Sequence, residues 1–211
     1  MRCGPSASKG TLMSAQELFW KWFEQHQEQL LHFEADRDKH FDMVADALQK
    51  VDSHLTFEFG PAEAKREFVI SAGGIRDAFS AVVSLVNAAP AMPDWRITAF
   101  RPRRTPLNTV EFRGKLANPQ EVQFSLLDNG RTAGIRLFIP HFLEGDSDWR
   151  QIGYLLLDDA LGEYDVETRL GFIKMYSPEV STSEKRYRFA ALPELFDRLI
   201  SHLEGHGAQP S

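Results

Sequence analysis

The spacing of apolar residues changes its period near residue 52, and this change restricts the possible folds more than any other feature. Before it, Phe19, Phe23 and Leu30 recur at the intervals of a helical stripe. From Leu55 to Phe59, apolar and polar residues alternate, which is the period of a half-buried strand. Helices followed by a run of strands and further helices predict an α+β fold.

A helical hairpin is expected at the start of this fold. Ser14 and Glu17 have the Ser-x-x-Glu spacing of a capping box, which predicts that the first helix begins there. A second helical pattern covers residues 36–51, after a short polar break. Two helices joined by so short a break predict an N-terminal helical hairpin.

Strand and helix patterns alternate through the rest of the chain. Asn129-Gly130 lies between two alternating apolar runs, which predicts a tight hairpin. The order strand, strand, helix, strand occurs twice, so two ββαβ-like units whose strands join one larger sheet are one interpretation. A single irregular antiparallel sheet with helices on one face is the alternative. Both interpretations predict a mainly antiparallel sheet. The strands are expected at residues 55–59, 66–72, 95–101, 110–116, 122–127, 133–139 and 170–176, and the later helices at residues 75–89, 148–162 and 192–203.

Length and composition are those of a globular protein. A chain of 211 residues with 43% hydrophobic residues can form one sizeable core, or at most two small domains. We expect a flexible leader at residues 1–13, a single α+β domain at residues 14–204 and a flexible tail at residues 205–211. A loop rich in Pro and Arg at residues 101–106 could divide the chain.

Charge and cysteine content exclude several classes of protein. A net charge of −6 gives no general attraction for nucleic acid or anionic membranes, so neither is expected as a partner. The single cysteine, Cys3, excludes a disulfide framework. No apolar run reaches the length of a membrane span, and the leader lacks the apolar core of a secretory signal. These features predict a cytoplasmic protein, and no motif points to a cofactor.

An acidic segment is the first candidate site. Asp158, Asp159 and Glu163 carry hard oxygen ligands of the kind that bind Mg²⁺ or Ca²⁺. Asp159 and Glu163 are four residues apart and would share one face of a continuous helix. One hypothesis is therefore a metal-dependent, hydrolase-like enzyme centred on these carboxylates. The alternative interpretation has no metal site, and the charges then solvate the end of a buried helix.

A cluster of arginines is the second candidate site. Arg101, Arg103 and Arg104 lie in the loop at residues 101–106. A guanidinium group can donate two parallel hydrogen bonds to a phosphate or carboxylate, which favours an anion-binding role. In the enzyme hypothesis these arginines would hold the phosphate of a substrate. The alternative is an exposed, solvated loop.

The first helix supplies the third candidate. Phe19, Trp20 and Phe23 belong to a segment that is apolar on nearly every side. Such residues are common at the centres of protein interfaces, although burial in the core explains them equally well. The leading interpretation is a non-enzymatic binding or protein-interaction domain, whose partner is another protein or a small molecule. It leaves self-association into a homo-oligomer open.

Three passages carry a resemblance to a known family. They are Leu55-Thr-Phe-Glu-Phe-Gly-Pro-Ala62, Arg66-Glu-Phe-Val-Ile-Ser-Ala72 and Leu157-Asp-Asp-Ala-Leu-Gly-Glu-Tyr-Asp-Val-Glu167. They resemble bacterial proteins with a domain of unknown function, of the DUF695 type, over most of the chain after Ser14. The resemblance implies a bacterial, cytoplasmic protein and assigns no activity, cofactor or site residue.

Overall fold

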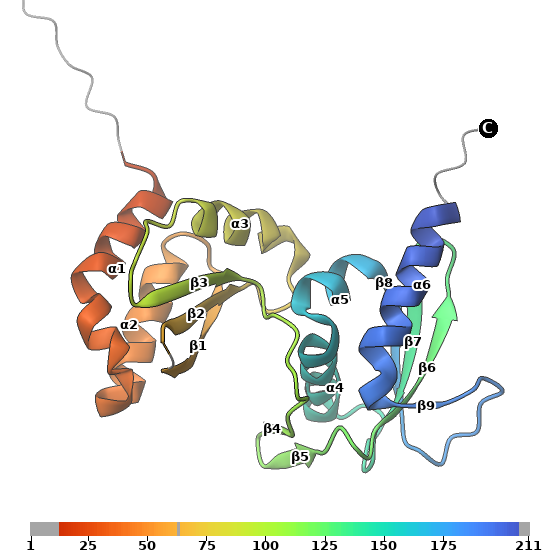
Figure 1. The fold of residues 1–211 in the computed structure, drawn as a ribbon. Coiled ribbons are helices and arrows are strands. Elements are labelled where there is room, and N and C mark those ends of the chain that lie inside the picture. Colours follow the sequence, from red (N-terminus) through yellow and green to blue (C-terminus); the bar gives the residue numbers. More distant parts are fainter. Residues whose placement is uncertain (1–12, 63, 207–211) are drawn as a thin grey trace, which may run out of the picture. The chain divides into compact units, whose positions relative to one another are not determined.

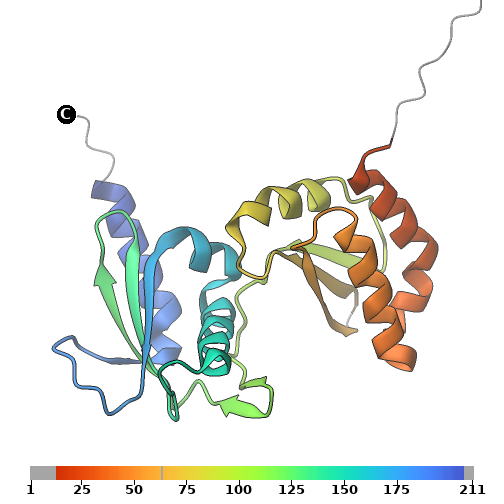
Figure 2. The ribbon, with the colours of Figure 1, turned by 180° about the vertical axis from the view of Figure 1, so that it is seen from behind.

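The computed structural model describes residues 13–62 and 64–206. It confirms the α+β class and the position of the helical hairpin before the sheets. Contacts divide the chain into two compact units, with the boundary between Ile97 and Thr98 (Figures 1 and 2). Each unit is described by itself. None of the helices in the described ranges is long and apolar enough to cross a membrane.

The two ends of the chain fall mostly outside these ranges. Of the leader expected at residues 1–13, only Met13 is described, and residues 207–211 of the expected tail are not described. The last helix, by contrast, continues to His206, so residues 205 and 206 are helical where a tail was predicted.

The first unit places a helical hairpin beside a three-stranded sheet. The sheet has the order β1-β2-β3, and β1 pairs with β2 in antiparallel register. The expected order strand, strand, helix, strand is present here. The elements are α1 (Ala15–Leu31), the 3₁₀ turn η1 (Phe33–Asp36), α2 (Arg37–Gln49), β1 (Thr56–Ala62), β2 (Arg66–Ser71), the 3₁₀ turn η2 (Arg76–Ala78), α3 (Phe79–Asn87) and β3 (Trp95–Ala99).

The capping box fixes the start of α1, as predicted. The Ser14 hydroxyl accepts a hydrogen bond from the Glu17 backbone N–H at 3.2 Å, and the Glu17 carboxylate accepts one from the Ser14 N–H at 2.7 Å. These bonds satisfy two backbone donors that have no partner inside the helix. The helix is then held by its apolar face, which packs on the sheet.

The core of the first unit is aromatic. Phe23 of α1 stacks on Phe68 of β2, with 5.0 Å between ring centroids and planes only 9° apart. Trp95 meets Phe23 edge to face at 5.0 Å, and Phe59 lies 5.4 Å from Trp95. Offset and edge-to-face contacts of this kind add to the free energy gained by burying the rings. Aromatic packing therefore joins α1 to β2 and β3, and Phe59 links β1 to the same cluster.

The second unit has a four-stranded sheet of order β8-β7-β6-β9. Its pairs are antiparallel except β7 and β8, which run parallel and are joined by a helical crossover. A two-stranded hairpin, β4-β5, stands apart from this sheet. The elements are β4 (Val110–Phe112), β5 (Lys115–Ala117), β6 (Gln123–Asp128), β7 (Ala133–Phe138), α4 (Ser147–Leu161), α5 (Glu163–Arg169), β8 (Leu170–Tyr176), β9 (Tyr187–Arg188), the 3₁₀ turn η3 (Phe189–Ala191) and α6 (Leu192–His206).

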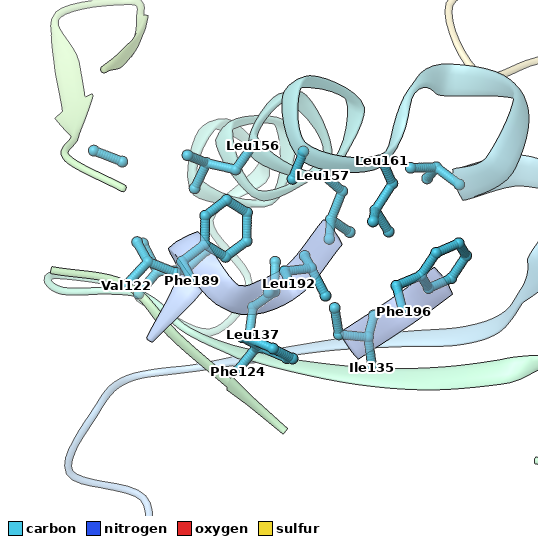
Figure 3. Packing of buried hydrophobic residues seen from close by; sticks show 14 of the residues in the cluster. Val122, Phe124, Ile135, Leu137, Leu156, Leu157, Leu161, Phe189, Leu192 and Phe196 are labelled. Carbon is cyan, nitrogen blue, oxygen red and sulfur yellow. The ribbon is translucent and has the colours of Figure 1, made fainter. Parts of the chain in front are cut away.

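Aliphatic side chains fill the core of the second unit. Helices α4 and α6 place leucines over one face of the sheet, opposite Ile135 and Leu137 of β7 (Figure 3). Phe124 of β6 and Phe196 of α6 are fully buried in the same layer. Helix α4 ends at Leu161, with Gly162 as its C-cap, and the polar groups described below lie at that end.

Three features of the structure were not expected. The strands lie in three separate sheets where one larger sheet was expected. The single strand expected at residues 110–116 is the β4-β5 hairpin, because Arg113 and Gly114 take left-handed φ angles of 48° and 77° in its turn. Residues 163–169, which lie between the expected helix at 148–162 and the expected strand at 170–176, form the helix α5. Glu163 and Asp165 lie in its first turn, where negative charge favours a helix.

Candidate functional site

The three aromatic residues proposed as interface anchors belong to the core. Phe19, Trp20 and Phe23 are at most 3% exposed. The Trp20 indole N–H donates to the Leu85 carbonyl oxygen of α3 at 2.7 Å. Helix α1 therefore packs against both the sheet and α3, which explains why its sequence is apolar on nearly every side. Since these side chains are covered, they are not available as exposed anchors.

The acidic and arginine candidates meet at the corner between α4 and α5. The Arg101 backbone N–H donates to the Glu163 carboxylate at 3.1 Å, and the Glu163 N–H donates to the Arg101 carbonyl oxygen at 3.0 Å. The Arg101 guanidinium donates to the Asp158 carboxylate at 3.3 Å. We call Arg101, Asp158 and Glu163 the Arg101 cluster. Glu163 is fully buried and Asp158 is 8% exposed, so this is an internal ionic contact.

Burial changes the acidity of one member of this cluster. It raises the pKa of Asp158 to about 7, because removing a carboxylate from water disfavours its charged form. The positive charge of Arg101 acts in the opposite direction, and the negative charge of Glu163 adds to the rise. Asp158 therefore changes its protonation state near neutral pH.

Arg103 is bound by several groups of the second unit. Its Nε donates to the Leu161 carbonyl oxygen at 2.8 Å, at the end of α4. Its two terminal nitrogens donate to Asp197 of α6 at 2.9 and 2.8 Å, and one of them also to Asp165 at 2.8 Å. The hydrogen bond to Asp197 is the main reason why the pKa of Arg103 is raised. This arginine therefore closes the end of α4 against α6.

The remaining two candidates are joined through the backbone. The Arg104 N–H donates to the Asp159 carbonyl oxygen at 2.7 Å. Sequence reasoning identified both charged clusters but did not predict that they pair with each other. The structure shows that the guanidinium groups of Arg101 and Arg103, which were expected to bind a substrate anion, are bound by the protein's own carboxylates and, for Arg103, a carbonyl oxygen. Within the described ranges, no three His, Cys, Asp or Glu side chains are placed to hold a metal ion.

A groove beside β8 is a site that the sequence did not reveal. It has a volume of about 310 Å³ and lies between the last four residues of β8 and helix α4, beside the loop that follows β7. Strand β8 pairs only with β7 among the described strands, so its other edge carries backbone groups without a strand partner. We call this site the β8 groove; it is lined by Phe142, Glu144, Gly145, Arg150, Tyr154, Ile173, Lys174, Met175 and Tyr176.

The charges in the β8 groove differ from those in the Arg101 cluster. Arg150 and Lys174 are exposed, and across the described residues neither side chain makes a hydrogen bond or ion pair. The Lys174 ammonium lies 5.8 Å from the Phe172 ring centroid. Glu144 is the carboxylate among the lining residues. The groove thus has two cations to one anion, beside half-buried apolar side chains.

Sequence distance explains why the groove was missed. Arg150 and Lys174 belong to different elements, and only the parallel pairing of β7 and β8 brings β8 next to α4. Neither residue stands in a motif. Short-range patterns could identify β8 as a strand but could not show that it lies at a sheet edge.

Comparisons with known proteins add no assignment. No protein-family model matches the chain, and no curated protein or solved structure is similar enough to be a match. The resemblance to the DUF695 type stays a prediction. Function must therefore be inferred from the sites themselves.

Proposed function

We propose that this protein is a non-enzymatic interaction domain that binds an extended, acidic peptide segment of a partner protein as an additional strand on β8. The observation that supports this is the outer edge of β8, which pairs with no other strand in the described ranges, beside a groove whose two cations form no ion pair with any described residue. The proposal gives a mechanism to the binding role that the sequence favoured. The metal-dependent alternative has no comparable support, since Arg101 binds the carboxylate oxygens of Asp158 and Glu163.

Strand addition suits the geometry of β8. This strand has seven residues, which is long enough to pair with a peptide through several backbone hydrogen bonds. Every second side chain of an added strand would point toward α4, where Phe142, Tyr154 and Met175 offer apolar surface. The backbone bonds would then give affinity, and the groove would select the side chains.

Charge identifies the class of partner. Arg150 and Lys174 are free to pair with Asp or Glu of a bound peptide, while Glu144 would repel a basic one. A second copy of this chain fits less well, because β8 carries Lys174 and no acidic side chain that could pair with Arg150 or Lys174 of the groove.

Binding of a designed peptide tests this proposal. The probe is a fluorescent nine-residue peptide that alternates Val or Thr with Glu, and its affinity for the full chain is measured by fluorescence anisotropy. We expect saturable binding that weakens at least tenfold in the double variant Arg150→Glu, Lys174→Glu. Arg131→Glu, at an exposed position in the β6–β7 turn, is the matched control and should bind like the unchanged protein.

Two altered peptides separate strand addition from simple charge attraction. A peptide with Lys in place of Glu should not bind. A second peptide keeps the same charge but is N-methylated at every second residue, which removes the backbone N–H groups on one edge of the peptide. When these are the groups that face β8, the peptide should bind at least tenfold more weakly. Equal binding of the methylated peptide, or unchanged binding by the double variant, would show that no strand is added at β8.

A further inference from the structure

The two cations of the β8 groove lie on opposite faces of the second sheet. Met175 pairs with Leu137 of β7, and both side chains pack in the core that α4 and α6 cover. Successive side chains of a strand point to opposite faces, so Lys174 points away from α4. Its ammonium lies 5.8 Å from the Phe172 ring centroid, on that other face. Arg150, by contrast, belongs to α4 itself.

The surroundings of Phe172 support this assignment of faces. Gly134 of β7 pairs with Phe172, and a side chain at Gly134 would collide with the Phe172 ring. Ala133 and Ile135, on either side of Gly134, are fully buried in the core. The Phe172 ring therefore covers Gly134 on the face opposite α4. Lys174, two residues further along β8, shares that face.

Lys174 has a like-charged neighbour on this face. It pairs directly with Arg136 of β7, and the Arg136 guanidinium already pairs with the Glu184 carboxylate. Lys174 is exposed, and its side chain forms no ion pair or hydrogen bond with any described residue. Like charges side by side on neighbouring strands are destabilising. An acidic side chain on a strand added at the open edge would face Lys174 and offset this repulsion.

The backbone of β8 determines where an added strand can form hydrogen bonds. The Ile139 N–H donates to the Tyr176 carbonyl oxygen at 2.9 Å, so Tyr176 directs its backbone groups toward β7. These directions alternate along a strand, and Ile173 and Met175 therefore direct theirs toward the open edge. A peptide bonded to these two residues places the residue between them opposite Lys174.

We propose, on the basis of strand addition at β8, that the partner peptide carries two acidic residues an odd number of positions apart. One acidic side chain faces Lys174, and the other points toward α4 and pairs with Arg150. Residues directly opposite each other on neighbouring strands share a face, and faces alternate along the peptide. Two acidic residues at an even separation can therefore reach only one of the cations. The spacing is the same for parallel and antiparallel addition, because it depends only on this alternation.

Three nine-residue peptides of identical composition test the proposed spacing. Each contains two glutamates among Val and Thr, at positions 3 and 5, 3 and 6, or 3 and 7. Fluorescence anisotropy with the full chain measures their affinities. We expect the peptide with an odd separation to bind about two- to fivefold more tightly than both others, because it forms one additional exposed ion pair. The even separations are one shorter and one longer, so the distance between the charges alone would not give this order.

Neutral variants assign the two ion pairs. Lys174→Gln and Arg150→Gln should each weaken binding of the odd-spaced peptide about two- to fivefold and remove its advantage over the others. Arg131→Gln, in the β6–β7 turn, is the matched control and should change no affinity. Equal binding of the three peptides, or an advantage that survives in either single variant, would overturn the proposed spacing alone. Absence of binding by all three would overturn strand addition as well.

Discussion

The two units solve the problem of burying a sheet in different ways. The first joins its helices to its sheet with aromatic rings, and its buried Arg66 pairs with a Glu34 side chain that is 60% exposed. The second packs leucines on its sheet and pairs a buried carboxylate, that of Asp158, with the half-buried Arg101. Aromatic packing does not depend on protonation, whereas a buried carboxylate does. The two units should therefore respond differently to cavities, pH and salt.

The largest effect is expected from a cavity in the first unit. Phe23 is fully buried between Phe68 and Trp95, so Phe23→Ala should lower the free energy of unfolding by about 3–5 kcal/mol. Leu18→Ala is the matched control on the same helix, because Leu18 is 53% exposed, and it should cost no more than about 0.5 kcal/mol. Denaturant unfolding gives both values. Hydrogen exchange should locate the loss in the first unit, and equal losses in both would contradict independent cores.

An intermediate effect is expected from Asp158 in the second unit. Burial raises the pKa of this carboxyl above its unfolded value, so the native state binds more protons than the unfolded state between about pH 4 and pH 7. Stability from this group is therefore present at low pH and is lost as the pH rises through about 7. Asp158→Asn keeps the site neutral and should stabilise the protein at pH 8 by on the order of a few kcal/mol.

The same variant should change stability little near pH 4, where Asp158 is already protonated. Denaturant unfolding across this pH range measures the difference, and Glu194→Gln on exposed α6 surface serves as the control. Hydrogen exchange in the first unit should not follow the change. A loss of stability at pH 8 in Asp158→Asn would mean that the charged pair with Arg101 outweighs the effect of burial.

The smallest effect is expected where the ionic contacts of the second unit reach solvent. Asp197 accepts two hydrogen bonds from Arg103, but its side chain is 57% exposed. Asp197→Asn should therefore cost only about 0.2–1 kcal/mol, and the loss should shrink as salt screens the charges. Unfolding at low and high NaCl concentration checks this. A loss above about 2 kcal/mol that does not depend on salt would place Asp197 with the buried pairs.

Features encoded by neighbouring residues could be predicted from the sequence. Ser14 and Glu17 begin α1 as the capping box requires, and Asn129-Gly130 joins β6 to β7 as predicted. Strand β8 has the predicted bounds, residues 170–176. The Arg113-Gly114 turn was missed because arginine seldom takes a left-handed conformation, so the pair gives no turn signal.

Contacts between distant residues could not be predicted in the same way. Arg101 and Asp158 are 57 residues apart, so nothing local shows that the basic loop supplies the acidic helix end with its partner. Likewise, the aromatic pattern of α1 could not distinguish an exposed face from a helix covered on two sides. The sequence identified the charged and aromatic residues, and the tertiary structure decided which of them are accessible.

The parallel pairing of β7 and β8 has a consequence for the order of folding. The β6–β7 hairpin closes over residues 129–132, while β8 can join β7 only after the crossover at residues 139–169 is in place. Closing the longer segment costs more chain entropy, so we expect amides of β6 to become protected before those of β8 in pulsed hydrogen exchange during refolding. Until then β7 is itself an open edge. A ribosome-bound chain that ends before residue 170 would expose this strand, which β8 covers in the complete protein, and with it a risk of aggregation.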